Sequence, residues 1–341
     1  MSKKKPKKIP EYETPKSYEE CFSYASLYES YRRCRLSKRD KREVLLFEKD
    51  FSKNLCALYY DLHYRRYELS GYHEFRIYDP KERVIQAISF RDRIVQHALV
   101  DNYLMPLLRR QFVFDNVACQ KGKGVYFAHR RMKLFLEEIK KYENPQQGYF
   151  VKADVHKFFE SIDHMVLKEK LFRLVKDKDI YDLLVKIIDS FHKETDKGLP
   201  MGNQSSQCFA LLYLSSLDHL LKEKEKVRFY LRYMDDMILF VDSKEEARKC
   251  LSLIESELEN VRLSLNPKST IYPFKEGFEM IGWRYRIRKN KTRVRLRRSS
   301  SKRIRLKRKQ GLSLESLKSY YGFLTMEKTP SLLKKEIREE I

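Results

Sequence analysis

The chain of 341 residues is long enough to bury a sizeable core and to form two or three subdomains. Its content of 42% hydrophobic and 13% aromatic residues excludes wholesale disorder. The 72 Lys and Arg against 48 Asp and Glu give a net charge of +24, which favours a polyanionic partner. Six cysteines lie too far apart for a zinc site or a disulfide framework, and no apolar run approaches the length of a membrane span. We therefore expect a cytoplasmic protein with no membrane partner.

The N-terminal part carries a basic arm, helices and a hairpin. Residues 1–16 place lysines among prolines, which predicts a flexible arm. Apolar residues at helical spacing predict helices from Tyr18 to about Tyr67. Residues 75–90 predict a β-hairpin that carries Lys81 and Arg83 near its tip. Cations placed there can bind a triphosphate, although a plain surface hairpin is an alternative.

Two more helices are predicted after this hairpin. Arg91–Val100 has an amphipathic pattern, and the helix is expected to end before Pro106. The loop Lys121–Gly124 then opens a helix from Val125 to about Lys141. Gly and Lys before a helix N-terminus can hold a phosphate, although an ordinary loop has the same pattern.

A single acid closes the next predicted strand. The apolar run Tyr149–Val155 follows a Pro- and Gly-containing break and has Asp154 near its end. An acid that ends a core strand before a turn into a helix is placed to join a metal site. Asp163 is the better N-cap for the helix that starts at His164, which leaves Asp154 free for metal.

A loop rich in Gly and Pro precedes the next helix. Thr195–Gln207 contains Gly198 and Gly202 and runs into an apolar helix, Cys208–Leu221. These glycines allow the backbone to approach a ligand closely, as a flat base pair would require. An ordinary loop that ends in a Ser or Asn cap is the alternative.

The stretch Arg228–Val241 predicts a hairpin with two acids at its tip. Asp235 and Asp236 stand side by side between β-prone runs, where two carboxylates repel each other. A divalent cation such as Mg²⁺ would explain them, because it prefers oxygen ligands; a solvated turn is the simpler alternative. An amphipathic helix from Lys244 to Leu263 follows, and the loop after it exposes Lys268.

The C-terminal part is aromatic and then strongly basic. Residues 278–287 predict an aromatic strand around Gly282 and Trp283, the single tryptophan. Residues 284–309 contain fifteen Lys or Arg and no acid. Within them, three arginines alternate with apolar residues and would form one basic strand face suited to a phosphate backbone: Arg293, Arg295 and Arg297. Residues 311–341 predict one or two helices.

This order of motifs, with Tyr233-Met234-Asp235-Asp236 at its centre, resembles the palm of a reverse transcriptase over roughly residues 75 to 290. The resemblance implies an α+β right-hand polymerase fold with helical and hairpin fingers, an antiparallel palm sheet backed by helices, and a small basic thumb. The implied division is 1–16 flexible basic arm, 17–145 mainly fingers, 146–275 mainly palm, and 276–341 primer grip and basic thumb.

The resemblance also implies an RNA-directed DNA polymerase that uses two Mg²⁺ ions, with Mn²⁺ as a substitute, and binds template RNA, a primer or cDNA strand, and dNTPs. The implied metal site consists of Asp154, Val155, Asp235 and Asp236, and Lys268 is a candidate proton donor to pyrophosphate. The implied substrate contacts are Lys81, Arg83, Phe159 as a gate against the ribose 2′-OH, Met201, Gly202 and Gln207. The implied nucleic-acid contacts are Gly282 and Trp283 of the primer grip and Arg293, Arg295 and Arg297 of the thumb.

The loop Gly202–Gln207 ends in Ser-Gln, whereas most bacterial reverse transcriptases end it in Ser-Pro. With the Arg91–Leu99 helix, the Gly-Lys-Gly loop and the compact length, this ending is similar to reverse transcriptases of diversity-generating retroelements, relatives of the group II intron and retron enzymes. That resemblance implies error-prone copying at template adenines for mutagenic retrohoming, a small basic accessory protein, and a prokaryotic or phage source.

Three alternatives remain open at this point. A retron-like or defence-associated reverse transcriptase would make a product that serves as a signal. A catalytically silent RNA-binding protein on the same scaffold would have no use for three converging acids. A metal-dependent nuclease would need acids, but not the loop, Lys268 and the primer grip together.

Overall fold

The computed structural model describes residues 13–78, 82–142, 147–191, 195–288, 291–327 and 332–340. The chain divides into two compact units. The first comprises Met1–Phe112 and Lys157–Ser215, and the second comprises Val113–His156 and Ser216–Ile341. Each unit is therefore built from segments that are distant in the sequence.

The first unit is mainly helical. Its helices and strands are α1 (Tyr18–Cys21), α2 (Tyr24–Cys34), α3 (Arg42–Lys49), α4 (Phe51–His63), β1 (Tyr72–Ile77), β2 (Arg83–Ile88), α5 (Phe90–Leu99), α6 (Met105–Leu108), α8 (Phe158–Ser161), α9 (His164–Leu174), α10 (Lys178–Asp189) and α11 (Gln204–Tyr213). The strands pair antiparallel with Phe75 opposite Ile85, so the predicted hairpin is confirmed. The Asp163 carboxylate accepts from the N–H of Val166 at 3.1 Å, which confirms it as the N-cap of α9.

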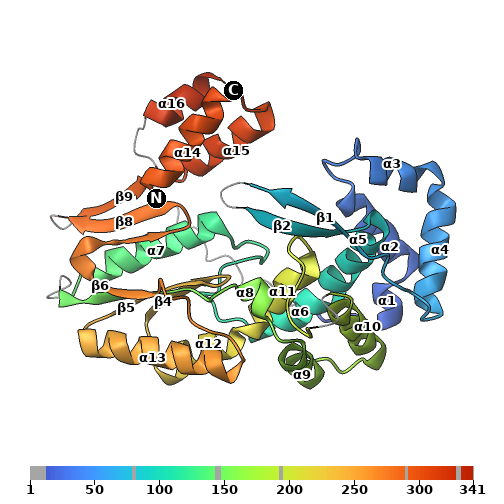
Figure 1. The fold of residues 1–341 in the computed structure, drawn as a ribbon, viewed down its shortest axis with the longest axis horizontal. Coiled ribbons are helices and arrows are strands. Elements are labelled where there is room, and N and C mark those ends of the chain that lie inside the picture. The colour runs from blue at the N-terminus through green and yellow to red at the C-terminus, as the bar shows by residue number, and fades with distance from the viewer. Residues whose placement is uncertain are drawn as a thin grey trace, which may run out of the picture. The chain divides into compact units, whose positions relative to one another are not determined.

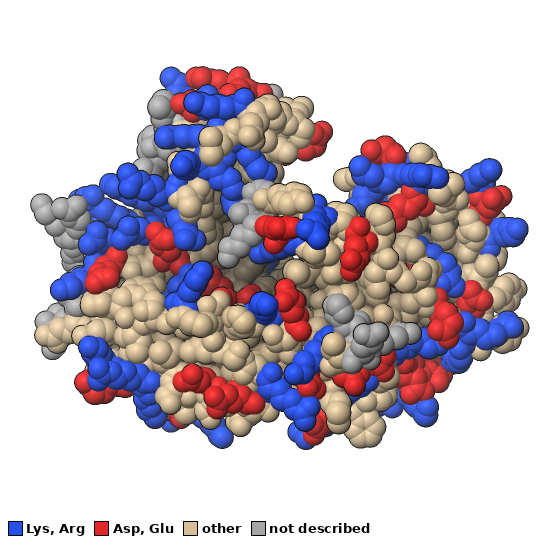
Figure 2. Space-filling view, in the orientation of Figure 1, with Lys and Arg blue, Asp and Glu red and all other residues tan. Residues whose placement is uncertain are grey.

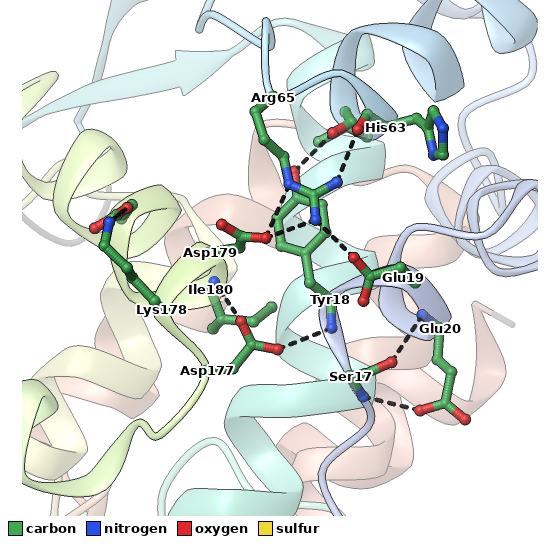
Figure 3. Close-up of polar contacts among 12 residues, drawn as sticks. Ser17, Tyr18, Glu19, Glu20, His63, Arg65, Asp177, Lys178, Asp179 and Ile180 are labelled. Carbon is green, nitrogen blue, oxygen red and sulfur yellow. Dashed lines mark hydrogen bonds and ion pairs between the residues drawn. The ribbon is translucent and has the colours of Figure 1, made fainter.

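Arg65, just after α4, connects three segments of the first unit (Figure 3). Its guanidinium lies over the ring of Tyr18, 4.0 Å from the ring centroid, and donates to Asp179 and Glu19, each at 2.6 Å. Burial raises the pKa of Tyr18 to about 12, so its hydroxyl stays protonated and donates to the Leu62 carbonyl at 3.0 Å. These contacts join α1 to the end of α4 and the start of α10.

Two boundaries in the first unit differ from the predictions. The expected helix end before Pro106 is wrong, because α5 continues through a π-helical segment, Val100–Leu104, into α6, which contains Pro106. Pro106 stands in the first turn of α6, directly after the π-helical segment. The helix predicted from Cys208 begins at Gln204 instead. The Ser205 hydroxyl in its first turn is buried and donates to Gln96 Oε1 at 2.9 Å.

The second unit contains both larger sheets. Its helices and strands are α7 (Val125–Ile139), β3 (Tyr149–Ala153), α12 (Ser215–His219, from the boundary onward), β4 (Phe229–Tyr233), β5 (Asp236–Val241), α13 (Lys244–Asn260), β6 (Thr270–Pro273), β7 (Phe278–Met280), β8 (Trp283–Arg288), β9 (Lys291–Leu296), α14 (Arg298–Lys309), α15 (Leu314–Leu324) and α16 (Leu332–Glu339). A four-stranded sheet has the order β4-β5-β3-β6, a three-stranded sheet has the order β7-β8-β9, and all strand pairs are antiparallel.

The core of the second unit lies between these sheets. The helix α13 lies along one face of the four-stranded sheet (Figure 1), and side chains of α7 and the three-stranded sheet pack on its other face. Phe150 of β3 illustrates this packing, since its ring lies 5.6 Å from Phe240 of β5 and 4.6 Å from Phe278 of β7. The strand order places the C-terminal end of β3 beside the turn between β4 and β5.

The single aromatic strand predicted for residues 278–287 is wrong. The segment forms two strands, β7 and β8, in which Met280 pairs with Trp283. Ile281 and Gly282 make the turn with positive φ angles of 45° and 85°. The aromatic pattern on both sides of the glycine hid the turn, although a positive φ is readily adopted by glycine.

The predicted α+β class, with an antiparallel sheet backed by helices, is confirmed by this arrangement. Among the described residues, no helix is long and apolar enough to cross a membrane. All six cysteines are free, and four of them are buried: Cys21, Cys34, Cys208 and Cys250.

Candidate active site

Three carboxylates lie at one edge of the four-stranded sheet in the second unit. The strand β3 ends at Ala153, which pairs with Met237, so Asp154 follows at the edge where β5 begins. Tyr233 pairs with Asp236 across the hairpin, which leaves Met234 and Asp235 as the turn. The structure thus brings Asp154, Asp235 and Asp236 together, as the sequence predicts.

A buried arginine, Arg232, holds the backbone of this turn. Arg232 and Asp218 are fully buried and form an ion pair at 2.6 Å. Arg232 also donates to the carbonyl of Met234 at 2.8 Å, and Met234 has a positive φ of 57°. The backbone just before Asp235 is therefore fixed by a contact that sequence patterns did not reveal, although an Asp within an apolar helix was a signal for a buried partner.

Burial and mutual repulsion perturb two of the acids. Burial raises the pKa of Asp235 to about 7, and the charge of Asp154, with which it shares a hydrogen bond, adds to the rise. Burial also raises the pKa of Asp236 to about 6; the charge of Lys152 opposes that rise and the charge of Asp154 adds to it. The ionised forms of these acids are costly here unless a cation compensates them.

Asp236 has a different environment from the other two acids. Its Oδ1 is buried, has no hydrogen-bond partner among the described residues, and lies 3.6 Å from Lys152 Nζ. Lys152 donates to the carbonyl of Glu279 in β7 at 2.9 Å. Asp154 and Asp235 therefore face each other, while Asp236 faces a lysine. A lysine within the apolar strand β3, two residues before an acid, was the signal that could have revealed this partner.

The acids fit a divalent cation whose coordination is completed by substrate. Within the described part of the chain, no three His, Cys, Asp or Glu side chains would hold a metal ion by themselves. Mg²⁺ commonly binds one or two carboxylates and takes its remaining ligands from water and substrate phosphates. The perturbed Asp235 beside Asp154 supplies hard oxygen ligands of that kind. Val155, also predicted at the metal site, is buried and pairs with Leu265.

Lys268 lies on the loop that contacts Asp154. Its side chain is exposed, and its backbone N–H donates to Asn266 Oδ1 at 3.0 Å. The amide of Asn266 donates to Asp154 Oδ2 at 2.8 Å, and Ser269 Oγ accepts from the N–H of Asp154 at 3.1 Å. The sequence pattern pointed to Lys268 in this loop but not to Asn266 and Ser269.

The predicted nucleotide contacts lie in the first unit. Arg83 is exposed at the start of β2, whereas Lys81 lies outside the described residues. Met201 exchanges two hydrogen bonds with Gln86 of β2, one from each backbone N–H, at 3.3 and 3.4 Å. A Cβ on Gly202, which has a φ of 116°, would lie 3.1 Å from Ile85. The hairpin and the loop therefore touch, and Gln86 is a contact that the sequence analysis missed.

Phe159 and Gln207 lie on helices next to this loop. Phe159 is half-buried in α8, and its carbonyl accepts from the N–H of Leu199 at 2.7 Å. Gln207 is half-buried within α11 rather than in the loop. The first unit thus brings Phe159 to the loop and places Gln207 one turn into the helix that follows.

The turn at Ile281 and Gly282, predicted as the primer grip, is anchored to α7 and α15. Trp283 is only 4% exposed, and its ring lies 5.2 Å from the rings of His129 and Phe323. A Cβ on Gly282 would lie 3.0 Å from the Phe323 ring. Trp283 therefore shapes the turn from the core, and its side chain is not a surface contact.

Basic side chains gather over β8, β9 and α14 (Figure 2). Arg293 and Arg295 are exposed on one face of β9, as the alternation predicts. Arg297 lies just after the strand and pairs with Glu279 at 2.9 Å, so it is not a free member of the stripe. The helix α14 extends the positive surface with residues that line an open hollow: Arg298, Lys302, Arg305 and Lys309.

Comparisons with known proteins agree with this arrangement. The family described as "Reverse transcriptase (RNA-dependent DNA polymerase)" matches residues 79–295, which is more than half of the chain. The chain is 24% identical over 267 residues to Protein YkfC of Escherichia coli, covering 63% of this chain and 68% of that protein. It is 24% identical over 205 residues to the putative COX1/OXI3 intron 2 protein of Saccharomyces cerevisiae, covering 41% of this chain and 24% of that protein.

Among solved structures, the chain is similar to telomerase from Candida tropicalis. One apo structure, truncated from the C-terminal domain, has a TM-score of 0.49 and 15% identity, and covers 71% of this chain and 60% of that one. A complex with a fragment of telomeric RNA has a TM-score of 0.49 and 14% identity, and covers 66% of this chain and 45% of that one. The chain thus spans less than two thirds of the telomerase chains.

The family match confirms the predicted enzyme class. It does not distinguish subfamilies. The chain belongs to the reverse transcriptase family of RNA-directed DNA polymerases, which are nucleotidyltransferases.

Proposed function

We propose that the protein copies a template RNA into cDNA by two-metal phosphoryl transfer at Asp154, Asp235 and Asp236. The observation that carries this proposal is the meeting of Asp154 and Asp235 at the palm edge, where burial raises the pKa of Asp235 to about 7, in a chain of the reverse transcriptase family. Binding alone has no need for acids held at such a cost.

The predicted catalytic residues of the second unit each have a proposed role in this reaction. Asp154 and Asp235, with Val155 beside them, would hold two Mg²⁺ ions, or Mn²⁺ in their place. Bound there, the cations would supply charge stabilisation to the attacking 3′ oxygen and the leaving phosphate oxygens. The negative charge of Asp236 would be balanced by these cations and by Lys152. The exposed Lys268 would donate a proton to pyrophosphate.

The first unit would bind the dNTP. Arg83, with Lys81, would offer donors to the triphosphate, since a guanidinium matches phosphate oxygens with two parallel hydrogen bonds. Phe159 would exclude a ribose 2′-OH. Met201, Gly202 and Gln207 would line the place where template base and incoming nucleotide meet.

Nucleic acid would be held along the second unit. The turn at Gly282 and Trp283 would position the primer or cDNA strand. Arg293 and Arg295, with the basic face of α14, would contact phosphates of the duplex. The division into fingers at 17–145, palm at 146–275 and thumb from 276 onward stays a prediction, as does the cytoplasmic location.

We further propose that the enzyme belongs to a diversity-generating retroelement and makes errors at template adenines. The support is the Ser-Gln ending of the Gly202–Gln207 segment. The hydrogen bonds between Gln86 and Met201 hold the residue just before this segment against β2. The unusual sequence of the segment would act on the nascent base pair. A small basic accessory protein would be its partner.

The test is sequencing of the cDNA that the purified protein makes on a primed RNA template with Mg²⁺. Asp235→Ala and Asp236→Ala should abolish synthesis and leave RNA binding nearly intact, whereas Asp242→Ala, on an exposed residue just after the other end of β5, should keep both. Synthesis at the normal rate by either active-site variant would refute the assignment. Errors concentrated at template adenines support the retroelement. Accurate copying, or errors spread evenly over the four template bases, favours a retron-like enzyme.

A further inference from the structure

The loop Leu265–Ser269 holds Asp154 at three places. The side-chain amide of Asn266 donates to Asp154 Oδ2 at 2.8 Å. The backbone N–H of Asn266 donates to the Asp154 carbonyl, also at 2.8 Å, and Ser269 Oγ accepts from the Asp154 N–H at 3.1 Å. A residue that follows a sheet strand is thereby fixed at its N–H, its carbonyl and one carboxylate oxygen.

The amide of Asn266 has one allowed orientation. Its Oδ1 accepts from the N–H of Lys268 at 3.0 Å, while its Nδ2 faces the Asp154 carboxylate. A flipped amide would place an oxygen against a carboxylate oxygen and an NH₂ group against an N–H donor. The two hydrogen bonds therefore determine each other, and they connect a predicted metal ligand to the turn that carries Lys268.

This contact leaves part of the carboxylate available. An ionised carboxylate has about four acceptor positions, and Asn266 occupies one of them on Oδ2. Asp235 lies beside Asp154 and shares a hydrogen bond with it. A neutral donor on Oδ2 fixes the rotation of the Asp154 carboxylate without adding a competing charge.

We propose that Asn266 is a positioning residue that orients the Asp154 carboxylate toward a divalent cation and fixes the Lys268 turn relative to it. The inference rests on the proposed metal-dependent polymerase function. Residues that hydrogen-bond a metal ligand commonly change metal affinity or activity by about 10- to 100-fold when they are removed.

Two variants separate the contacts of Asn266. Asn266→Ser keeps an oxygen that can accept from the Lys268 N–H, but its side chain is too short to reach Asp154. Asn266→Ala removes both contacts. Asn260→Ala is the matched control, because Asn260 is an exposed residue at the end of α13 whose amide contacts only a surface glutamate, Glu257, at 3.5 Å in the described structure.

The measurement is Mn²⁺ binding to the metal-free full chain, followed by the electron paramagnetic resonance signal of free Mn²⁺ without RNA or nucleotide. Asn266→Ser and Asn266→Ala should weaken binding by about tenfold or more. Single-nucleotide incorporation should show kcat lowered by a similar factor and KM for dNTP changed by less than about threefold. The Asn260→Ala variant should match the wild type in both assays.

Wild-type Mn²⁺ affinity in Asn266→Ser overturns the inference. An Asp154→Asn variant distinguishes this failure from failure of the proposed function. If Asp154→Asn loses Mn²⁺ binding and synthesis while Asn266→Ser keeps them, only the role of Asn266 is wrong. If Asp154→Asn also keeps both, the proposed metal site itself is wrong.

Discussion

Replacing Arg232 by Met should strongly destabilise the second unit and disturb the turn that carries Asp235. Arg232 and Asp218 are both 0% exposed. Arg232 donates to the two oxygens of Asp218 at 2.7 and 2.6 Å, and Asp218 also accepts from Tyr230 at 2.6 Å and Asn116 at 3.3 Å. Without the guanidinium, two neutral donors remain for a carboxylate in an apolar interior.

The expected loss of stability follows from that uncompensated charge. Removing one partner of a buried ion pair costs about 3–5 kcal/mol. With a urea slope of about 3 kcal/mol per molar, the unfolding midpoint should fall by about 1 M or somewhat more. Fluorescence of Trp283, the single tryptophan, reports on this unit because its ring lies in the same core.

Controls separate charge from packing. Arg228→Met removes an exposed arginine that pairs with Glu138 at 3.0 Å and should cost less than about 1 kcal/mol. The double variant Arg232→Met with Asp218→Asn removes both charges and should recover at least half of the lost stability. It should still synthesise cDNA about tenfold or more slowly, since the contact to the Met234 carbonyl is gone. A midpoint shift below about 0.3 M in Arg232→Met, or a double variant no more stable than the single one, would refute the reasoning.

Four further predictions concern the site, its supports and the basic face of β9. Because the pKa of Asp235 is raised to about 7, Mg²⁺ must compete with a proton below that pH, so the Mg²⁺ concentration for half-maximal synthesis should rise as pH falls from 8 to 6. By the same shift, the metal-free protein binds that proton more tightly when folded, so the contribution of Asp235 to stability should fall as pH rises from about 4 to 7, which acid-to-neutral urea titrations of the wild type and Asp235→Asn can measure. Gly282→Ala should lower the melting temperature, because it forces a φ of 85° on alanine and meets the Phe323 ring at 3.0 Å; an unchanged melting temperature would contradict this. Arg293→Ala and Arg295→Ala should each reduce the salt dependence of duplex binding by about one phosphate contact, and an unchanged slope in both would exclude the β9 face from the interface.

Local sequence patterns determined the elements that carry the chemistry. Alternating apolar and polar residues specified β9, and the two β-prone runs around Asp235 specified its hairpin, because side-chain direction in a strand depends on position alone. An acid after the apolar strand β3 likewise pointed to Asp154. These features need no knowledge of distant partners.

The tertiary structure alone decided how the site is supported. Asn266 meets Asp154 across 112 positions of sequence, and the pairing of Arg232 with Asp218 depends on which helix packs beneath the hairpin. Lys152 faces Asp236 because of the register between β3 and β5. Such pairings are set by burial and by strand register, which arise only when segments far apart in the chain pack together, so the sequence identifies the acids of this protein while the fold determines what orients them.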